Sequence, residues 1–150
     1  MMKASLNWQT GWIAQRLAAT IPPVPYIPQT TYPLREWMDG IRWLRDNTKH
    51  SDVVIAQLTA ANYIPAYSGN TVYFGQTNTV NYERKQIEVD RFFKGGMSSN
   101  EAQIFLRNGR INYIFYSIQE KELGSPSFET YLPLFDSVYT NPIVTIFRVK

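Results

Sequence analysis

Cysteine is absent from this 150-residue chain, and histidine occurs once, at His50. The lack of cysteine excludes disulfide bonds, thiolate metal sites and a thiol nucleophile. A histidine-based zinc site or a Ser-His-Asp triad would depend on His50 alone. Because His50 lies in the polar segment "TKHSD", we predict that it is a solvated turn residue. We therefore expect no metal and no cofactor.

Long apolar runs and clusters of basic charge are also missing. No run approaches the ~20 residues that cross a bilayer, and the N-terminus lacks the pattern of a signal peptide. The 15 basic and 12 acidic residues leave a net charge of +3, and the longest basic run is Arg84-Lys85. Nucleic-acid binding is therefore not expected. The phosphate-binding motifs G-x-G-x-x-G and G-K-[ST] are absent as well.

Aromatic residues are plentiful, with 10 Tyr, 8 Phe and 4 Trp, and they predict a well-packed core. The first 32 residues differ from the rest, because closely spaced prolines favour an extended connector. We predict that residues 1–32 form an amphipathic segment and a proline-rich linker, and that residues 33–150 form a single α/β domain. The connector either leads from a missing N-terminal part or packs as a strap on the domain.

Hydrophobic periodicity predicts the elements of the domain. Residues 34–44 repeat at helical spacing, with Trp37, Ile41 and Leu44 on the buried stripe. Ser98 and Glu101 form the capping-box pattern of a helix that ends near Asn108. The remaining predicted elements are a strand over 52–57, a short helix stopped by Pro65, a strand over 71–74, a helix over 81–94, a strand over 111–117, a polar loop, and a hairpin over 134–139 and 143–149.

Helical connectors of 10 to 20 residues between strands imply right-handed crossovers and parallel pairing. The closing hairpin adds at least one antiparallel strand. The predicted fold class is therefore α/β, a small three-layer sandwich with a mixed, mostly parallel sheet and a C-terminal β-hairpin.

The polar loop "GQTNTVNY" is the strongest ligand-binding candidate, since one glycine and several small polar donors precede a helix N-terminus. Its candidate binding residues are Gly75, Gln76, Thr77, Thr79 and Tyr82. The alternative is structural: Thr77 and Thr79 cap the helix and satisfy the loop backbone.

Acidic residues form no catalytic set in this sequence. Glu88 and Asp90 are two apart on a helix and point away from each other. Glu120 and Glu122 follow the third predicted strand, where α/β sheets usually bind ligands, but Glu120-Lys121-Glu122 is predicted to be a charged surface loop. No nucleophile–base pair is present, and we expect no catalytic residue.

The order of short motifs over residues 33–150 resembles a known family. A "WLR-N-T" helix precedes a "DVV-A" strand, "IPAYSG", a "VY-G" strand, a "T-NY" helix start, the "INYIFYS" strand and the final "VYTNPIVTIFRV" hairpin. This order is similar to the soluble C-terminal region of polytopic membrane proteins of the dolichyl-phosphate-mannose glycosyltransferase type (GT-C-like). Such proteins often carry "GH" or a tryptophan where this chain has Gly75-Gln76.

The resemblance implies a non-catalytic accessory domain on the extracytoplasmic face of a membrane. Its partners would be its own N-terminal transmembrane region, which would hold the catalytic carboxylates, and a sugar or lipid-linked sugar. Two alternatives stay open: an independent binding module for a small polar ligand or sugar, and a small α/β enzyme.

Overall fold

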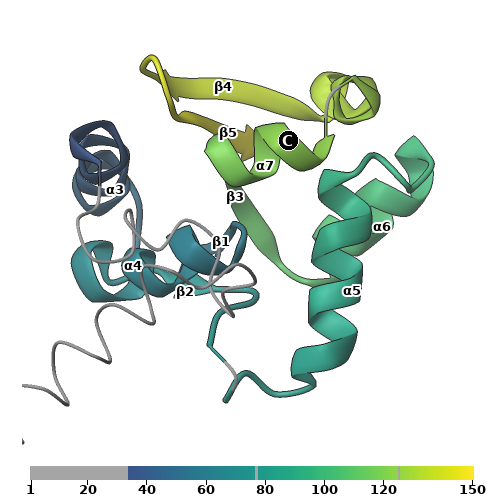
Figure 1. The fold of residues 1–150 in the computed structure, drawn as a ribbon, viewed down its shortest axis with the longest axis horizontal. Coiled ribbons are helices and arrows are strands. Elements are labelled where there is room, and N and C mark those ends of the chain that lie inside the picture. Colours follow the sequence, from purple (N-terminus) through teal and green to yellow (C-terminus); the bar gives the residue numbers. More distant parts are fainter. Residues whose placement is uncertain (1–33, 77, 125) are drawn as a thin grey trace, which may run out of the picture. The chain divides into compact units, whose positions relative to one another are not determined.

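Five strands form one mixed sheet in the order β2–β1–β3–β5–β4, shown in Figure 1. The computed structural model describes residues 34–76, 78–124 and 126–150, so the predicted segment 1–32 lies outside the described residues. The strands are β1 (Val53–Ile55), β2 (Thr71–Val72), β3 (Ile111–Tyr116), β4 (Phe135–Thr140) and β5 (Thr145–Val149). The helices are α3 (Arg35–Asn47), α4 (Leu58–Ser68), α5 (Tyr82–Phe93), α6 (Ser99–Asn108), α7 (Ile118–Gly124) and the 3-10 helix η1 (Ser127–Leu134).

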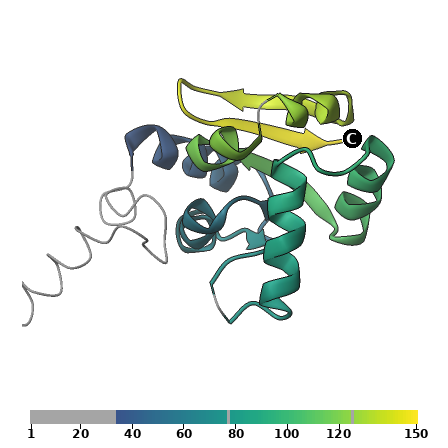
Figure 2. The same cartoon turned by 45° about the vertical axis from the view of Figure 1, so that its right-hand side comes forward.

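The sheet is parallel at one end and antiparallel at the other. β1 pairs in parallel with β2 and β3, whereas β5 is antiparallel to both β3 and β4. The turn of the β4–β5 hairpin is held by Asn141, whose side-chain Oδ1 accepts hydrogen bonds from the backbone N–H groups of Ile143 and Val144. With helices on both faces of the sheet and the hairpin at its C-terminal end (Figure 2), the predicted fold class is confirmed.

Alternating residues of β3 serve the two faces of the sheet. Ile114 belongs to a buried aromatic-rich cluster with residues of α5, α6 and η1. Phe115 points to the other face, toward α3, where Gly40 brings the helix close to the sheet. A Cβ at Gly40 would lie 3.0 Å from Val144 Cγ1 and 3.1 Å from Phe115 Cε2. Residue 40 must therefore be small for α3 to pack at this distance.

Two helices behave as their local patterns predict. In α3 the stripe of Trp37, Ile41 and Leu44 is fully buried, and Asp39 pairs with two arginines of the solvent face. In α6 the capping box is present, with Ser98 Oγ accepting from Glu101 N–H and Glu101 accepting from Ser98 N–H. No described helix has both the length and the apolar character required to span a bilayer.

Three predicted boundaries are wrong. α4 does not stop at Pro65 but continues to Ser68, because packing against α3 outweighs the single hydrogen bond that the proline loses. β2 ends at Val72, two residues earlier than predicted. The predicted loop after β3 instead contains α7 and η1, and η1 buries Phe128 and Tyr131 in the aromatic cluster.

Candidate functional site

The polar loop between β2 and α5 lines a groove of ≈ 510 Å³ together with α4. Gly75, Gln76 and Thr79 of the predicted site contribute to it, and Thr77 lies outside the described residues. The remaining lining residues are Ala61, Asn62, Pro65, Ala66, Val72 and Asn78. The structure therefore brings three of the five candidate residues to one concave surface.

Tyr82, the fifth candidate, is not among the lining residues. Its half-buried ring packs on Phe74, with ring centroids 5.1 Å apart. Phe74 itself is buried in the aromatic cluster. Tyr82 thus anchors the first turn of α5 to the core. This packing explains why an aromatic residue occupies position 82 without invoking a ligand.

Thr79 satisfies the backbone of the loop. Its Oγ1 accepts a hydrogen bond of 3.2 Å from the N–H of Gly75, and its own N–H donates to the carbonyl of Gln76 at 2.9 Å. The expectation that Thr79 caps the helix is wrong, since the N-cap of α5 is Asn81, in the left-handed region with φ 58° and ψ 42°. Thr79 closes the loop and leaves the helix N-terminus without a side-chain cap.

Three side-chain amides in this groove remain available for hydrogen bonding. Asn62 and Gln76 are exposed, as is Asn78, and all three line the groove. Within the described part of the chain, no hydrogen bond occupies their side chains. Amides both donate and accept, so the groove has the hydrogen-bonding capacity that a polyhydroxylated ligand requires.

A second polar cluster lies where the parallel strands β1 and β3 end. Glu120, in the first turn of α7, is fully buried there. Its Oε1 accepts 2.6 Å from the backbone N–H of Gln57, just after β1. Its Oε2 accepts from the N–H of Ser117 at 2.9 Å and from the hydroxyl of Ser117 at 2.7 Å. The prediction that Glu120-Lys121-Glu122 is a surface loop is therefore wrong for Glu120.

Neighbouring glutamines extend this cluster. Gln119 Oε1 accepts from the N–H of Thr59 in the first turn of α4 at 3.2 Å. Gln57 Nε2 donates to Asp90 of α5 at 3.0 Å. Parallel α/β sheets usually bind ligands at this edge, but here protein side chains fill the position and use its donors. The arrangement is structural, since it joins α4, α5 and α7 to the sheet.

Burial raises the pKa of the Glu120 carboxyl above its ordinary value, and the donors from Gln57 and Ser117 oppose this shift only in part. No cation neutralises this carboxylate among the described residues, because no salt bridge includes it. A buried carboxyl with a raised pKa is a feature of catalytic acids. Here, however, Glu120 is fully buried and both oxygens accept hydrogen bonds from protein donors, so a substrate cannot reach it.

The other acidic candidates are separated, as predicted. Glu88 accepts a hydrogen bond of 2.7 Å from the Tyr73 hydroxyl, whereas Asp90 faces Gln57. In the residues that the structure describes, no group of three or more His, Asp and Glu side chains could hold a metal ion. His50 is exposed, in agreement with a solvated turn residue.

The buried cluster was missed in the sequence, although one signal for it exists. Ser117 and Glu120 have the Ser-x-x-Glu spacing that marks a helix N-terminus. The structure shows the corresponding bonds from Ser117 to Glu120, and α7 begins at Ile118. Neither Gln57 nor Gln119 carries such a signal, because their partners are distant in sequence. Gln57 bonds to Glu120 and Asp90, 63 and 33 positions away, and Gln119 bonds to Thr59, 60 positions away.

Comparison with known proteins finds a similar fold. No family model matches the chain, and no curated protein matches it. Among solved structures, the fold of the chain is similar to that of the C-terminal globular domain of an oligosaccharyltransferase. That structure is the crystal structure of the C-terminal globular domain of an oligosaccharyltransferase from Archaeoglobus fulgidus, with a TM-score of 0.58 and 16% identity. The match covers 78% of this chain and 98% of that domain.

Proposed function

We propose that this chain is a non-catalytic accessory domain of a membrane glycosyltransferase-like protein, of the dolichyl-phosphate-mannose type that the motif order resembles. The observation that carries the proposal is the shared fold, which extends over 98% of the oligosaccharyltransferase domain. The motif order of residues 33–150 independently suggests the same kind of parent protein. In this proposal the domain lies on the extracytoplasmic face, next to its own transmembrane region.

A non-catalytic role agrees with the chemistry of the described residues. Glu120 is occupied by protein donors, Glu88 and Asp90 diverge, and His50 is exposed. The Ser117 hydroxyl donates to Glu120 at 2.7 Å, but both side chains are fully buried, so a substrate cannot reach this pair. The catalytic carboxylates would then belong to the membrane-embedded region, and this domain would assist the handling of the acceptor or the lipid-linked sugar.

The test uses the complete reading frame that contains this sequence. Membranes carrying the whole protein, and membranes carrying a form truncated before residue 34, are compared for glycosyl transfer from lipid-linked sugars. We expect reduced transfer in the truncated form and none from the 150-residue chain alone. A reading frame without hydrophobic spans would overturn the proposal. Turnover by the isolated chain that a single Glu or His substitution abolishes would overturn it as well.

A second function, binding of a small polar ligand or sugar, is favoured by one observation. Asn62, Gln76 and Asn78 present three free amides along one groove. Titration of the 150-residue chain with mono- and disaccharides, followed by amide NMR, tests it. Binding predicts saturable shifts in the groove that disappear when Gln76 and Asn78 are replaced by Ala. Shifts that persist in this double variant would contradict it.

A further inference from the structure

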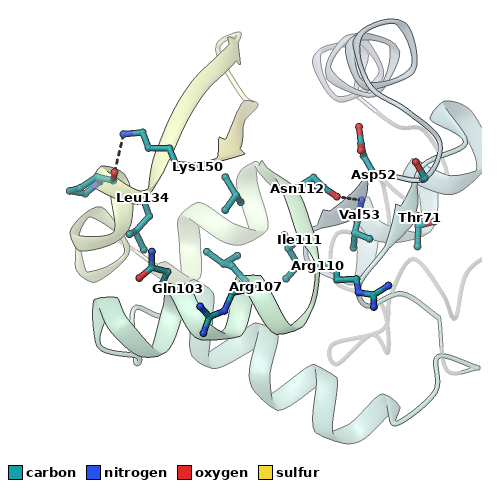
Figure 3. Close-up of a pocket in the computed structure, with 14 residues that line it drawn as sticks. Asp52, Val53, Thr71, Gln103, Arg107, Arg110, Ile111, Asn112, Leu134 and Lys150 are labelled. Carbon is teal, nitrogen blue, oxygen red and sulfur yellow. Dashed lines mark hydrogen bonds between the residues drawn. The ribbon is translucent and has the colours of Figure 1, made fainter.

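A groove larger than that of the polar loop lies at the opposite end of the parallel strands from Glu120. It has a volume of ≈ 830 Å³ and lies where β1, β2 and β3 begin, at Val53, Thr71 and Ile111. Its other walls come from α6, from the end of η1 and from the end of β5. Figure 3 shows the side chains that line it.

The groove contains two arginines without an acidic partner. Six of the eight described arginines form salt bridges: Arg35, Arg42, Arg45, Arg84, Arg91 and Arg148. The remaining two, Arg107 and Arg110, have no carboxylate partner among the described residues, and both line this groove. Both are also exposed. Their charges are therefore available to anionic groups of a binding partner.

The backbone at Arg110 gives a second indication. Its φ of 51° lies in the left-handed region, which glycine and asparagine enter easily and other residues enter at a cost. The position follows the last turn of α6, where glycine is the usual residue. The C-terminal dipole of α6 favours a cation at Arg107, but it does not explain a strained arginine at 110. Backbone strain of this kind clusters at binding and active sites.

The two arginines serve different parts of the groove. In Figure 3 the side chain of Arg110 extends toward Thr71, and that of Arg107 extends away from it, with Ile111 between them. One compact anion therefore cannot contact both guanidinium groups. An occupant that contacts both must be extended and must carry an anionic group toward each of its ends.

The other polar groups of the groove leave these arginines uncompensated. The carboxylate of Asp52 accepts from the N–H of Lys49 at 2.9 Å, and in Figure 3 it points away from Arg110. Asn112 Oδ1 accepts from the N–H of Val53, which leaves the amide N–H groups of Asn112 as further donors. The groups that remain available are donors, and they favour an occupant rich in acceptors.

The floor of the groove is aliphatic. Leu106 and Ile111 form part of the core cluster beneath it, and half-buried Val53, Leu134 and Val149 complete it. No Phe, Tyr or Trp occurs among the described residues that line the groove. Single-stranded nucleic acids stack their bases on aromatic side chains, whereas apolar side chains of a peptide pack on aliphatic ones. The floor therefore favours a peptide over a nucleic acid.

We propose that this groove binds an extended segment of a partner protein in which acidic residues stand on both sides of an apolar pair. The acidic side chains contact Arg107 at one end and Arg110 at the other, and the apolar pair contacts the floor. Arginine suits the ends because its planar fork of N–H donors pairs with carboxylates. The segment is held and not chemically changed. The inference depends on the groove alone and not on the accessory-domain role proposed above.

The test is titration of the full 150-residue chain with the peptide Glu-Asp-Leu-Leu-Asp-Glu, blocked at both ends, followed by amide NMR at low ionic strength. The peptide contains no Asn, Ser or Thr, so its binding is distinct from any recognition of a residue that accepts a sugar. We expect saturable shifts at the groove residues. The absence of saturable shifts would overturn the proposal.

Altered peptides test the two features of the segment. Gln-Gln-Leu-Leu-Gln-Gln lacks the charges, and Glu-Asp-Gly-Gly-Asp-Glu lacks the apolar pair. Each should bind about tenfold more weakly than the parent peptide. Undiminished affinity of either altered peptide would contradict the proposal. Tighter binding of a single-stranded oligonucleotide than of the parent peptide would assign the groove to a nucleic acid and contradict it as well.

Variants separate the groove from general charge effects. Arg107→Gln and Arg110→Gln should each weaken binding of the parent peptide about threefold. Arg42→Gln removes the same charge from α3, outside the groove, and should leave the affinity unchanged. Arg110→Gly also removes the guanidinium but relieves the left-handed strain, so it should bind like Arg110→Gln while its melting temperature rises. Equal affinities for the Arg107 and Arg42 variants would be incompatible with the proposed contact.

Peptides with one acidic end test whether a single segment spans both arginines. Gln-Gln-Leu-Leu-Asp-Glu and Glu-Asp-Leu-Leu-Gln-Gln each lose the contact with one arginine. Each should therefore reduce the effect of one arginine substitution and keep the effect of the other, with the roles exchanged between the two peptides. Purely additive effects of the peptide and protein changes would show that the acidic ends do not contact the arginines, and would refute the proposal.

Discussion

The carboxylate of Glu120 accepts a hydrogen bond of 2.6 Å from the backbone N–H of Gln57, 63 positions earlier in the chain. The same side chain binds the N–H and hydroxyl of Ser117. Gln57 follows β1 and Ser117 follows β3, so one side chain joins the ends of two parallel strands. This link fills the edge of the sheet where α/β proteins usually bind ligands.

Replacement of Glu120 by Gln should destabilise the fold. The substitution turns one carboxylate oxygen into an NH₂ group that faces a backbone or hydroxyl donor, and leaves a buried donor unsatisfied. We expect a loss of ~2 kcal/mol in the free energy of unfolding at about pH 5, measured by urea denaturation. Glu122→Gln, an exposed position on the same helix, should change stability by less than ~0.5 kcal/mol. Equal small effects would contradict the structural role of Glu120.

The contribution of Glu120 should depend on pH. Burial raises the pKa of its carboxyl above the ordinary value of 4.5, so folding favours the protonated form. Such a group contributes fully below its unfolded pKa, and its contribution is lost as the pH rises through the folded pKa. The stability difference between the wild type and Glu120→Gln should therefore shrink as the pH rises from about 4 to about 8. Denaturation of both proteins over this pH range measures the difference. A difference that grows with pH would contradict a raised pKa for Glu120.

The two tryptophans of α3 should differ in their contribution to stability. Trp37 is fully buried, and Trp37→Ala should cost ~3–5 kcal/mol because it leaves a large cavity. Trp43 is half-buried against Tyr113 and Tyr139 at the edge of the stripe, and Trp43→Ala should cost less. Chemical denaturation of both variants measures the difference. Similar small losses would be incompatible with the burial of Trp37.

Thr79→Val tests the role of the polar loop. The substitution removes the oxygen that accepts from the N–H of Gly75 and should lower stability by ~1 kcal/mol. Thr79→Ser keeps the acceptor and serves as the control. The predicted structural role also requires that sugars shift the loop NMR signals equally in both variants. A sugar-dependent shift of the loop signals that Thr79→Val abolishes and Thr79→Ser keeps would instead show a binding role. Loss of that shift in the double variant Thr77→Val/Thr79→Val would show the same.

Much of the fold could be predicted from the sequence, because its signals are local. The helical spacing of Trp37, Ile41 and Leu44 and the capping box of Ser98 and Glu101 act within one or two turns, and both are present in the structure. The closing hairpin likewise follows from alternation around Asn141. The prediction that the helix ends at Pro65 is wrong, because α4 packs on α3 and this non-local interaction outweighs the local preference of proline.

The candidate site could be predicted only in part. Gly75, Gln76 and Thr79 are close in sequence and line one groove. Asn62 of α4 lines the same groove, and no local sequence pattern predicts that it does. Proximity in sequence predicts Tyr82 for the same site, whereas its ring packs on Phe74. The direction of a side chain depends on the element that carries it, which is set by tertiary packing.

The sequence by itself determined the α/β class, the helices and strands with clear periodicity, and the absence of thiol chemistry. Only the tertiary structure decided which charges are buried and which are exposed together. Glu120 and Glu122 have the same charge and lie two positions apart, yet Glu120 is buried because Gln57 and Ser117 reach it. Arg107 and Arg110 are distinguished from the other arginines by a groove that three strands, two helical segments and the chain end build together. Burial and charge pairing depend on residues distant in sequence, and local patterns do not encode them.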